Sequence, residues 1–156
     1  YWHSFPVSMQ PFVSDTSDGP LLEQTVNSVV NEWESSIGRE IWNISPLAQG
    51  NPNSGNYIKW SFDFGNETGF DPSRTLAVTI RYNRGTFMER VVIILNGGMA
   101  TLRQNFAGTL RKTLLHEFGH TVGLDHSTAY SIMQASLGSI DSVQADDVAG
   151  MSALIS

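Results

Sequence analysis

Hydrophobic positions recur with two different periods along the chain, one typical of helices and one typical of strands. Within residues 20–38, apolar residues recur every three or four positions, which predicts an amphipathic helix packed on a core. Proline at its start and glycine past its end agree with those limits. Further helices are expected over residues 106–123 and 143–154, and Asp141 or Ser142 would cap the last one.

Short segments of alternating or continuous apolar residues predict five strands. Because Pro11 cannot donate a backbone hydrogen bond, we expect the first strand at an edge of the sheet. The order of the elements predicts an α+β fold, in which a twisted mixed sheet packs on two helices and a helical part follows. The strands cover residues 7–13, 39–45, 57–64, 75–82 and 90–95, with turns or loops at residues 14–19, 46–56, 65–74 and 83–85.

Composition places the chain among globular proteins and predicts one domain over residues 1–156. The net charge of −6, with nine scattered Lys and Arg residues, argues against a nucleic-acid partner or an anionic membrane surface. No segment approaches the ~18 apolar residues of a membrane span. The chain has no cysteine, so its fold needs no disulfide. It starts at Tyr1 without a methionine, and we therefore expect a processed product.

Residues 113–127, which read TLLHEFGHTVGLDHS, contain three of the four histidines. Four positions separate His116 from His120, which places both side chains on one face of a helix, one turn apart. Zinc in a catalytic site takes three protein ligands and keeps a fourth position for water. Gly123 can adopt a positive φ angle, end the helix and turn the chain, so that His126 supplies the third ligand. This spacing predicts a catalytic zinc site.

Glu117 lies beside a ligand but is poorly placed to bind the same ion. It can reach a zinc-bound water instead, act as general base towards a peptide carbonyl, and then return the proton to the leaving amine. Histidines placed by chance on a helix are the alternative. It is disfavoured because three histidines, a glutamate and a glycine stand in register. The residues behind the ligands also form an apolar face suited to burial: Leu110, Leu114, Phe118 and Val122.

The long histidine motif, followed by a methionine at Met133, resembles the metzincin clan of zinc endopeptidases. Within that clan, Ser127 and the segment 144–151 resemble the matrixins, the matrix-metalloproteinase family. The resemblance implies a metzincin-like, mostly parallel five-stranded sheet with an antiparallel edge strand. It also implies two long helices packed on the sheet, an active-site helix, a Met-turn and a C-terminal helix. An upper subdomain would cover about residues 1–123 and a lower one about residues 124–156.

The resemblance also implies roles for residues outside the histidine motif. Met133 would lie beneath the zinc site without binding it, and Asp147 would support the Met-turn. Asp146 would pair with the amino group of Tyr1, or the terminus would be frayed and the acidic helix face solvated. Protein or peptide substrates would bind extended along the edge strand, residues 75–82. Other expected cleft residues are Leu76, Ala77, Val78, Lys112, Gln134 and Ala135. Lys112 would either limit the depth of the specificity pocket or stay solvated.

Departures from the matrixin pattern shape the remaining expectations. Val78 stands where the family carries a structural-zinc histidine, so we expect one catalytic zinc ion and no second one. Calcium binding by Asp63, Glu67 and Asp71 is possible, but a solvated loop is favoured because the ligands are few. The predicted protein is a monomeric zinc endopeptidase that is secreted or extracellular, or else periplasmic. The alternatives are a catalytically silent metzincin-like peptide-binding module and a structural zinc domain.

Overall fold

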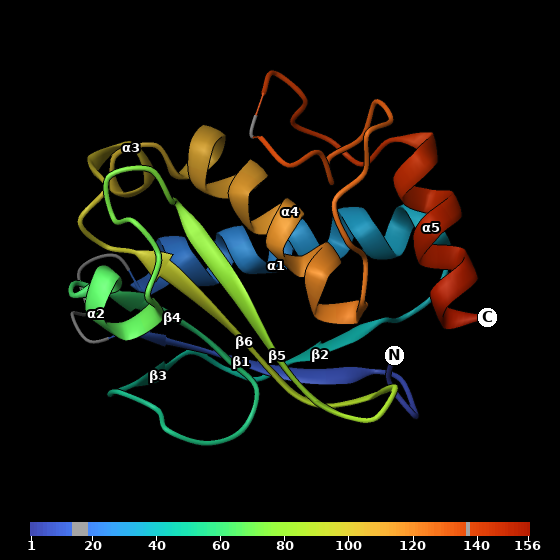
Figure 1. Ribbon diagram of the computed structural model, residues 1–156, viewed down its shortest axis with the longest axis horizontal. Coiled ribbons are helices and arrows are strands. Elements are labelled where there is room, and N and C mark those ends of the chain that lie inside the picture. The colour runs from blue at the N-terminus through green and yellow to red at the C-terminus, as the bar shows by residue number, and fades with distance from the viewer. Residues whose placement is uncertain (14–18, 137) are drawn as a thin grey trace.

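The computed structural model describes residues 1–13, 19–136 and 138–156 and shows a twisted sheet with long helices on one face (Figure 1). The mixed α/β class predicted from the sequence is confirmed. In chain order the elements are β1 (Val7–Val13), α1 (Gly19–Ile37), β2 (Trp42–Ile44), β3 (Ala48–Gln49), β4 (Tyr57–Ser61), α2 (Phe64–Thr68), β5 (Ala77–Arg84), β6 (Phe87–Asn96), α3 (Ala100–Arg103), the π-helical turn η2 (Phe106–Leu110), α4 (Arg111–Val122) and α5 (Ala145–Ile155).

The sheet is mostly parallel and ends in an antiparallel edge strand, as expected. Its strand order is β2-β1-β4-β6-β5, with parallel pairs along the path until β5, which runs antiparallel to β6. The two-residue β3 pairs with the end of β1, so the described residues form a six-stranded sheet rather than the expected five-stranded one. The long β5–β6 hairpin leaves β5 at the edge.

The expectation that residues 7–13 form an edge strand is wrong, because β1 lies between β2 and β4. Backbone N–H groups point to alternate sides along a strand, and the Gln10 N–H donates to the Asn56 carbonyl beside β4. The nitrogen of Pro11 therefore faces the other side. On that side, β1 pairs with β2 only as far as Met9, and its pairing with β3 begins at Phe12. Proline occupies a gap in the ladder and costs no hydrogen bond.

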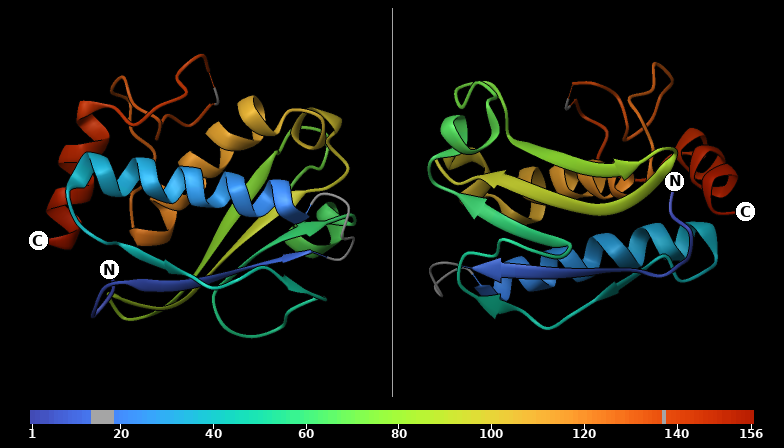
Figure 2. Two further views of the ribbon diagram at one scale, coloured as in Figure 1. Left: turned by 180° about the vertical axis from the view of Figure 1, so that it is seen from behind. Right: turned by 60° about the horizontal axis from the view of Figure 1, so that its bottom comes forward.

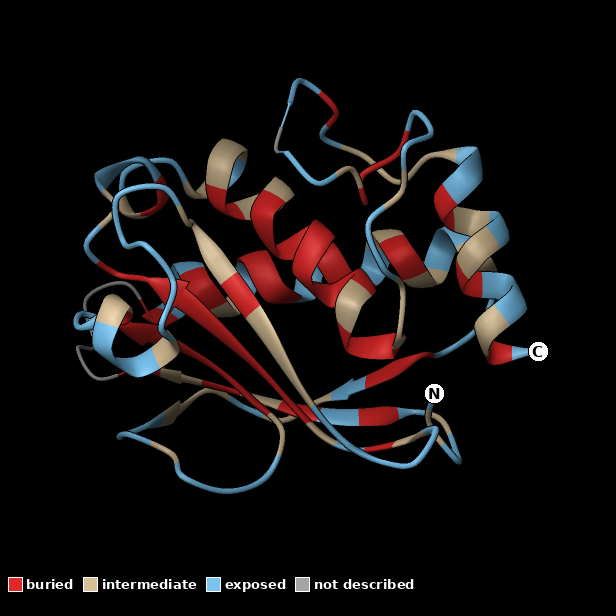
Figure 3. Ribbon diagram, viewed as in Figure 1, coloured by how far each residue is buried: buried red, intermediate tan, exposed pale blue. Residues whose placement is uncertain are grey.

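Helix α1 matches the predicted amphipathic helix and packs on the same face of the sheet as α4 (Figure 2). Most of its predicted stripe is buried, and Gly38 follows it with a φ angle of 87°. One cluster of buried side chains joins both helices to the sheet, the segment around Met133 and α5. The buried faces of the helices and strands accordingly point inwards (Figure 3). The expected upper and lower subdomains thus share one core.

Several boundaries differ from the prediction. Residues 106–123 are helical in two parts, η2 and α4. The last helix begins at Ala145, because the Asp147 carboxylate accepts the Gln144 N–H at 2.9 Å, and neither Asp141 nor Ser142 caps it. The turn expected at residues 14–19 lies outside the described residues, except for Gly19, which begins α1.

Segments predicted as loops contain short elements. β3 lies within residues 46–56, and α2 takes up the last residue of the predicted strand 57–64 and part of the loop that follows it. Phe64 of α2 is buried against the outer face of the sheet, in a second cluster with Tyr57, Val78, Val92 and Ile94. This apolar anchor explains why β4 stops at Ser61 and the chain turns into a helix.

Candidate active site

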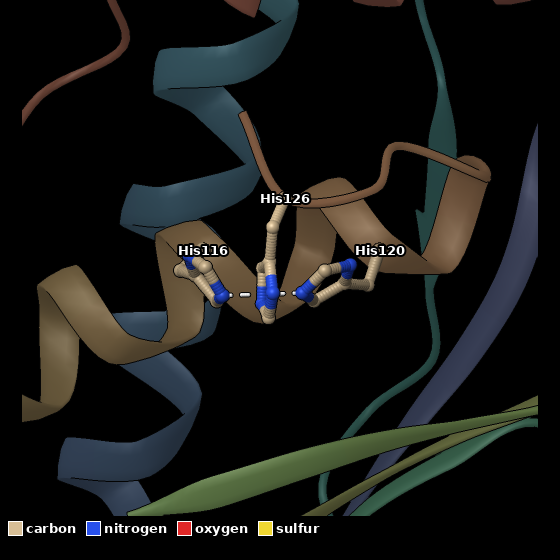
Figure 4. A group of neighbouring side chains, drawn as sticks. All are labelled: His116, His120 and His126. Atoms are coloured by element: carbon tan, nitrogen blue, oxygen red, sulfur yellow. Dashed lines mark hydrogen bonds between the residues drawn. The ribbon is translucent and has the colours of Figure 1, made fainter. Parts of the chain in front are cut away.

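Helix α4 and the segment after it bring the three histidines together (Figure 4). The Nε2 atoms of His116 and His120 lie 3.1 Å apart, and the possible ligand atoms of these two and His126 all lie within 4.8 Å of one another. Gly123 ends the helix with a φ angle of 123°, and its N–H donates to the His120 carbonyl. The chain then turns back, and His126 reaches the other two histidines from beyond the helix.

The donor atoms of the histidines fit a zinc ion. Nδ1 of His116 lies 2.7 Å from the Ile132 carbonyl oxygen, and Nδ1 of His120 lies 2.7 Å from that of Leu124. Because a carbonyl only accepts, each Nδ1 carries the proton and each Nε2 offers a lone pair to the shared centre. Tetrahedral zinc with Zn–N distances of ~2.0–2.1 Å separates two nitrogens by about 3.3 Å, close to the observed spacing.

The electrostatics also favour the metal-binding form of the histidines. Burial, and after it the neighbouring His116, lower the pKa of His120 to about 4. Burial likewise lowers the pKa of His116, against the effect of its bond to Ile132. Both rings are therefore neutral at neutral pH, which is the state that binds a metal.

Glu117 is buried at the base of the cleft, with 6% of its surface exposed. Its Oε1 accepts a hydrogen bond of 2.8 Å from the Thr79 hydroxyl, and its Oε2 lies 4.0 Å from His116 Nε2. Burial raises the pKa of Glu117 to about 7, although the Thr79 bond acts in the opposite direction. A carboxylate with such a pKa can exchange a proton near neutral pH.

Met133 lies directly beneath the active-site helix, 2% exposed. A Cβ atom placed on Gly119 would come within 2.4 Å of its sulfur, so the thioether touches the helix next to His120. The Asp147 carboxylate holds the preceding residue in place by accepting the Ile132 N–H at 2.8 Å. Met133 therefore lies beneath the helix that carries His116 and His120, and Asp147 makes a hydrogen bond to the segment that contains Met133.

The expected pair between the Tyr1 amino group and Asp146 is wrong. The Tyr1 ammonium donates to the Thr86 carbonyl at 2.7 Å, and the Tyr1 carbonyl accepts from Met88. Asp146 instead accepts a hydrogen bond of 2.8 Å from the hydroxyl of Ser127. The N-terminal residues therefore lie along the β5–β6 hairpin, and Asp146 fixes the residue that follows the third histidine.

A cleft of about 690 Å³ opens over the histidines, between β5 and the segment after Met133. Four of the predicted cleft residues line it: Leu76, Ala77, Val78 and Ala135. Lys112 and Gln134 do not line it, and for Lys112 this agrees with the alternative of a side chain outside the specificity pocket. Lys112 is half-buried and donates to the Gly138 carbonyl at 2.7 Å, whereas Thr113 lines the cleft beside His116. Gln134 turns away to donate to the Ala129 carbonyl.

Thr79 and Arg81 also line the cleft and are not among the residues predicted from the sequence. Arg81 donates to the Asp125 carboxylate at 2.9 Å, which ties β5 to the segment that carries His126. Alternate residues of a strand share one face, so the predicted Ala77 could have pointed to positions 79 and 81. The sequence pattern did not indicate that Thr79 would contact Glu117 or that Arg81 would contact Asp125.

The acids considered for calcium each have separate partners. Glu67 pairs with the buried Lys59 ammonium at 2.6 Å, Asp63 accepts from Asn66, and Asp71 accepts from Ser73. Among the described residues, the three histidines form the one cluster of His, Cys, Asp or Glu side chains close enough to hold a metal ion. Within the same residues, no helix is long and apolar enough to cross a membrane.

The fold and the three-histidine site define a zinc metallopeptidase of the metzincin type. The crystal structure of archaemetzincin from Methanopyrus kandleri has the same fold, with a TM-score of 0.58 over 96% of this chain and 95% of that one, at 11% sequence identity. The sequence profile of the matrixin family, Peptidase_M10, matches residues 40–156. The chain therefore belongs to the matrixin family. No curated protein sequence matches it.

Proposed function

We propose that the protein is a matrixin-type endopeptidase that cleaves internal peptide bonds of proteins, with Glu117 as general base and acid. The observation that carries this proposal is the buried Glu117 carboxylate, whose Oε2 lies 4.0 Å from Nε2 of His116. His116, His120 and His126 would hold the zinc ion. When bound, zinc polarises a carbonyl and lowers the pKa of a water molecule.

Residues of the chain would transfer the protons and orient the metal ligands. Glu117 accepts the proton of the attacking water and later delivers it to the leaving amine. Its raised pKa, about 7, suits both steps, because the group can lose and regain a proton near neutral pH. The bonds from Nδ1 of His116 and His120 to backbone carbonyls keep the ligands in one tautomer and orientation.

Strand β5 offers the substrate a binding edge. It is the last strand in the sheet order, and the cleft runs along residues 75–79 above the histidines. An extended peptide can add to such an edge through main-chain hydrogen bonds, which places its carbonyl groups at regular intervals over the site. This supports an endopeptidase, since the lining residues follow the strand over several positions and so match an extended peptide.

Glu117→Gln tests the proposal, because it keeps the size of the side chain and removes the base. We expect stoichiometric zinc in wild type and variant, measured by atomic emission, and a fall in kcat/KM of roughly 10²- to 10⁴-fold on a quenched-fluorescence peptide. Equal cleavage by the two proteins would refute the mechanism. Peptide binding by wild type with no cleavage would favour the silent binding module instead.

We further propose that the enzyme acts outside the cytoplasm as a monomer. The support is the resemblance to matrixins alone. Fractionation of the source cells with an antibody, and light scattering of the purified chain, would test the two statements separately.

A further inference from the structure

The Thr79 hydroxyl contacts Glu117 across two separate elements, β5 and α4. Its Oγ1 lies 2.8 Å from Glu117 Oε1 and 3.2 Å from the Glu117 carbonyl oxygen. A hydroxyl has one proton to donate, and the shorter distance to a charged oxygen makes the carboxylate the better acceptor. The two residues are 38 positions apart in the sequence, so the contact exists only in the folded protein.

This bond makes the two oxygens of Glu117 unequal. Oε1 is held by Thr79, while Oε2 lies on the side of the histidines, 4.0 Å from His116 Nε2. A glutamate side chain has several rotatable bonds, and a fixed Oε1 leaves its carboxylate plane little freedom to turn. The oxygen facing the histidines is the one that the proposed mechanism needs.

Thr79 also belongs to the strand that would bind the substrate. It lines the cleft in the middle of β5, where it pairs with Ile93 of β6 on its inner side. A peptide added to the outer edge of β5 takes its position from this backbone. One residue would thus fix both the carboxylate and the strand beside the substrate, and so set the distance between the base and the scissile bond.

We propose that Thr79 is a positioning residue for the peptidase reaction, whose hydroxyl anchors Oε1 of Glu117 so that Oε2 faces the attacking water. The inference rests on the proposed function of Glu117 as general base. Misplacement of a reacting group by about 1 Å can cost a factor of roughly 10² in rate. Loss of the anchor should therefore slow the chemical step and leave peptide binding to the β5 backbone unchanged.

Thr79→Val and Thr79→Ser form a matched pair for the test, because valine keeps the shape and serine keeps the hydroxyl. We expect kcat of the zinc-loaded Thr79→Val protein to fall by about 10- to 100-fold with KM within about twofold of wild type. Thr79→Ser should keep kcat within about threefold, since its hydroxyl can make the same bond. Thr25→Val is the control, because it too loses a hydroxyl bond, to Leu21 within α1, a helix that contributes no residue to the lining of the cleft.

Each outcome separates the inference from the proposed function. Wild-type kcat for Thr79→Val, or a change confined to KM, would overturn the inference while an inactive Glu117→Gln protein upholds the function. An active Glu117→Gln protein would overturn both. Should Thr79→Val fail to fold or to bind zinc, Thr79→Ala and Thr79→Ser repeat the comparison with one atom changed. Equal kcat for that pair would count against the role of the hydroxyl.

Discussion

Replacing Gly119 with alanine tests whether Met133 supports the active-site helix by direct contact. The added Cβ would lie 2.4 Å from Met133 Sδ and 3.3 Å from Cζ2 of Trp33. Carbon and sulfur atoms pack at roughly 3.5–4.0 Å, so either the thioether or the helix must move by about 1 Å. Both Gly119 and Met133 are buried, and because protein cores are close-packed, a shift of either one displaces its neighbours.

The expected size follows from two opposing effects. Alanine is better than glycine inside a helix by about 1 kcal/mol, which alone would stabilise the variant. Overpacking of a filled core costs about 1–3 kcal/mol. We therefore expect Gly119→Ala to lower the free energy of unfolding by up to about 2 kcal/mol. Because His120 is the next residue, zinc affinity should fall as well.

Urea unfolding of the metal-free protein measures the change in the free energy of unfolding. A zinc titration with a competing chelator measures the change in zinc affinity. Met133→Ala removes the thioether and should by itself cost about 2–5 kcal/mol through the cavity it leaves. In that background the alanine at position 119 should no longer destabilise, and the double-mutant cycle should give a favourable coupling of about 1–3 kcal/mol. A Gly119→Ala protein that is about 1 kcal/mol more stable than wild type, with no coupling to Met133, would refute the contact.

Three further outcomes follow from the site. Asp147→Ala leaves the N–H groups of Ile132 and Gln144 without their acceptor, and urea unfolding should show a loss of roughly 2–5 kcal/mol; an unchanged midpoint would contradict this. Zinc at 100 times its dissociation constant should add about 2.7 kcal/mol to the unfolding free energy, and a chelator should remove it. For the metal-free protein, the pKa of His120 is about 4 when folded and 6.5 ordinarily, so its contribution is full above pH 6.5 and is lost as pH falls towards 4. The pKa of Glu117 is raised from 4.5 to about 7, so its contribution to the free energy of unfolding is present at low pH and is lost as pH rises through that range. Glu117 therefore opposes the acid destabilisation caused by His120. Removing it in Glu117→Gln should make the loss of stability with falling pH steeper, as measured by circular dichroism.

The three-histidine cluster could be predicted from the sequence because its geometry is local. The spacing of His116 and His120 needs only a helix, and the turn at Gly123 needs only one backbone angle. The stripe of α1 and the alternation of the strands are local patterns of the same kind. Such patterns can be predicted without knowledge of the tertiary structure, because they require only that one face of each helix or strand is buried.

What could not be predicted depends on contacts between distant segments. Whether β1 lies at an edge is decided by β2 and β4, and Pro11 fits only because pairing passes from β2 to β3 at its position. The Lys112 ammonium donates to the Gly138 carbonyl outside the cleft, and the Tyr1 amine donates to the Thr86 carbonyl instead of pairing with Asp146. In each case one hydrogen bond, set by tertiary packing, redirects a side chain or chain end.

The chemical groups of the site are oriented by parts of the chain that the histidine motif does not contain. The tautomer of His116 is fixed by the Ile132 carbonyl, and Ile132 is held in turn by Asp147 of α5. The orientation of Glu117 is fixed by Thr79 of the edge strand. A helix carrying the motif alone would keep the spacing of the ligands but neither the tautomer nor the direction of the carboxylate. The motif therefore determines which atoms are present, and the sheet, the Met133 segment and the last helix determine whether those atoms can react.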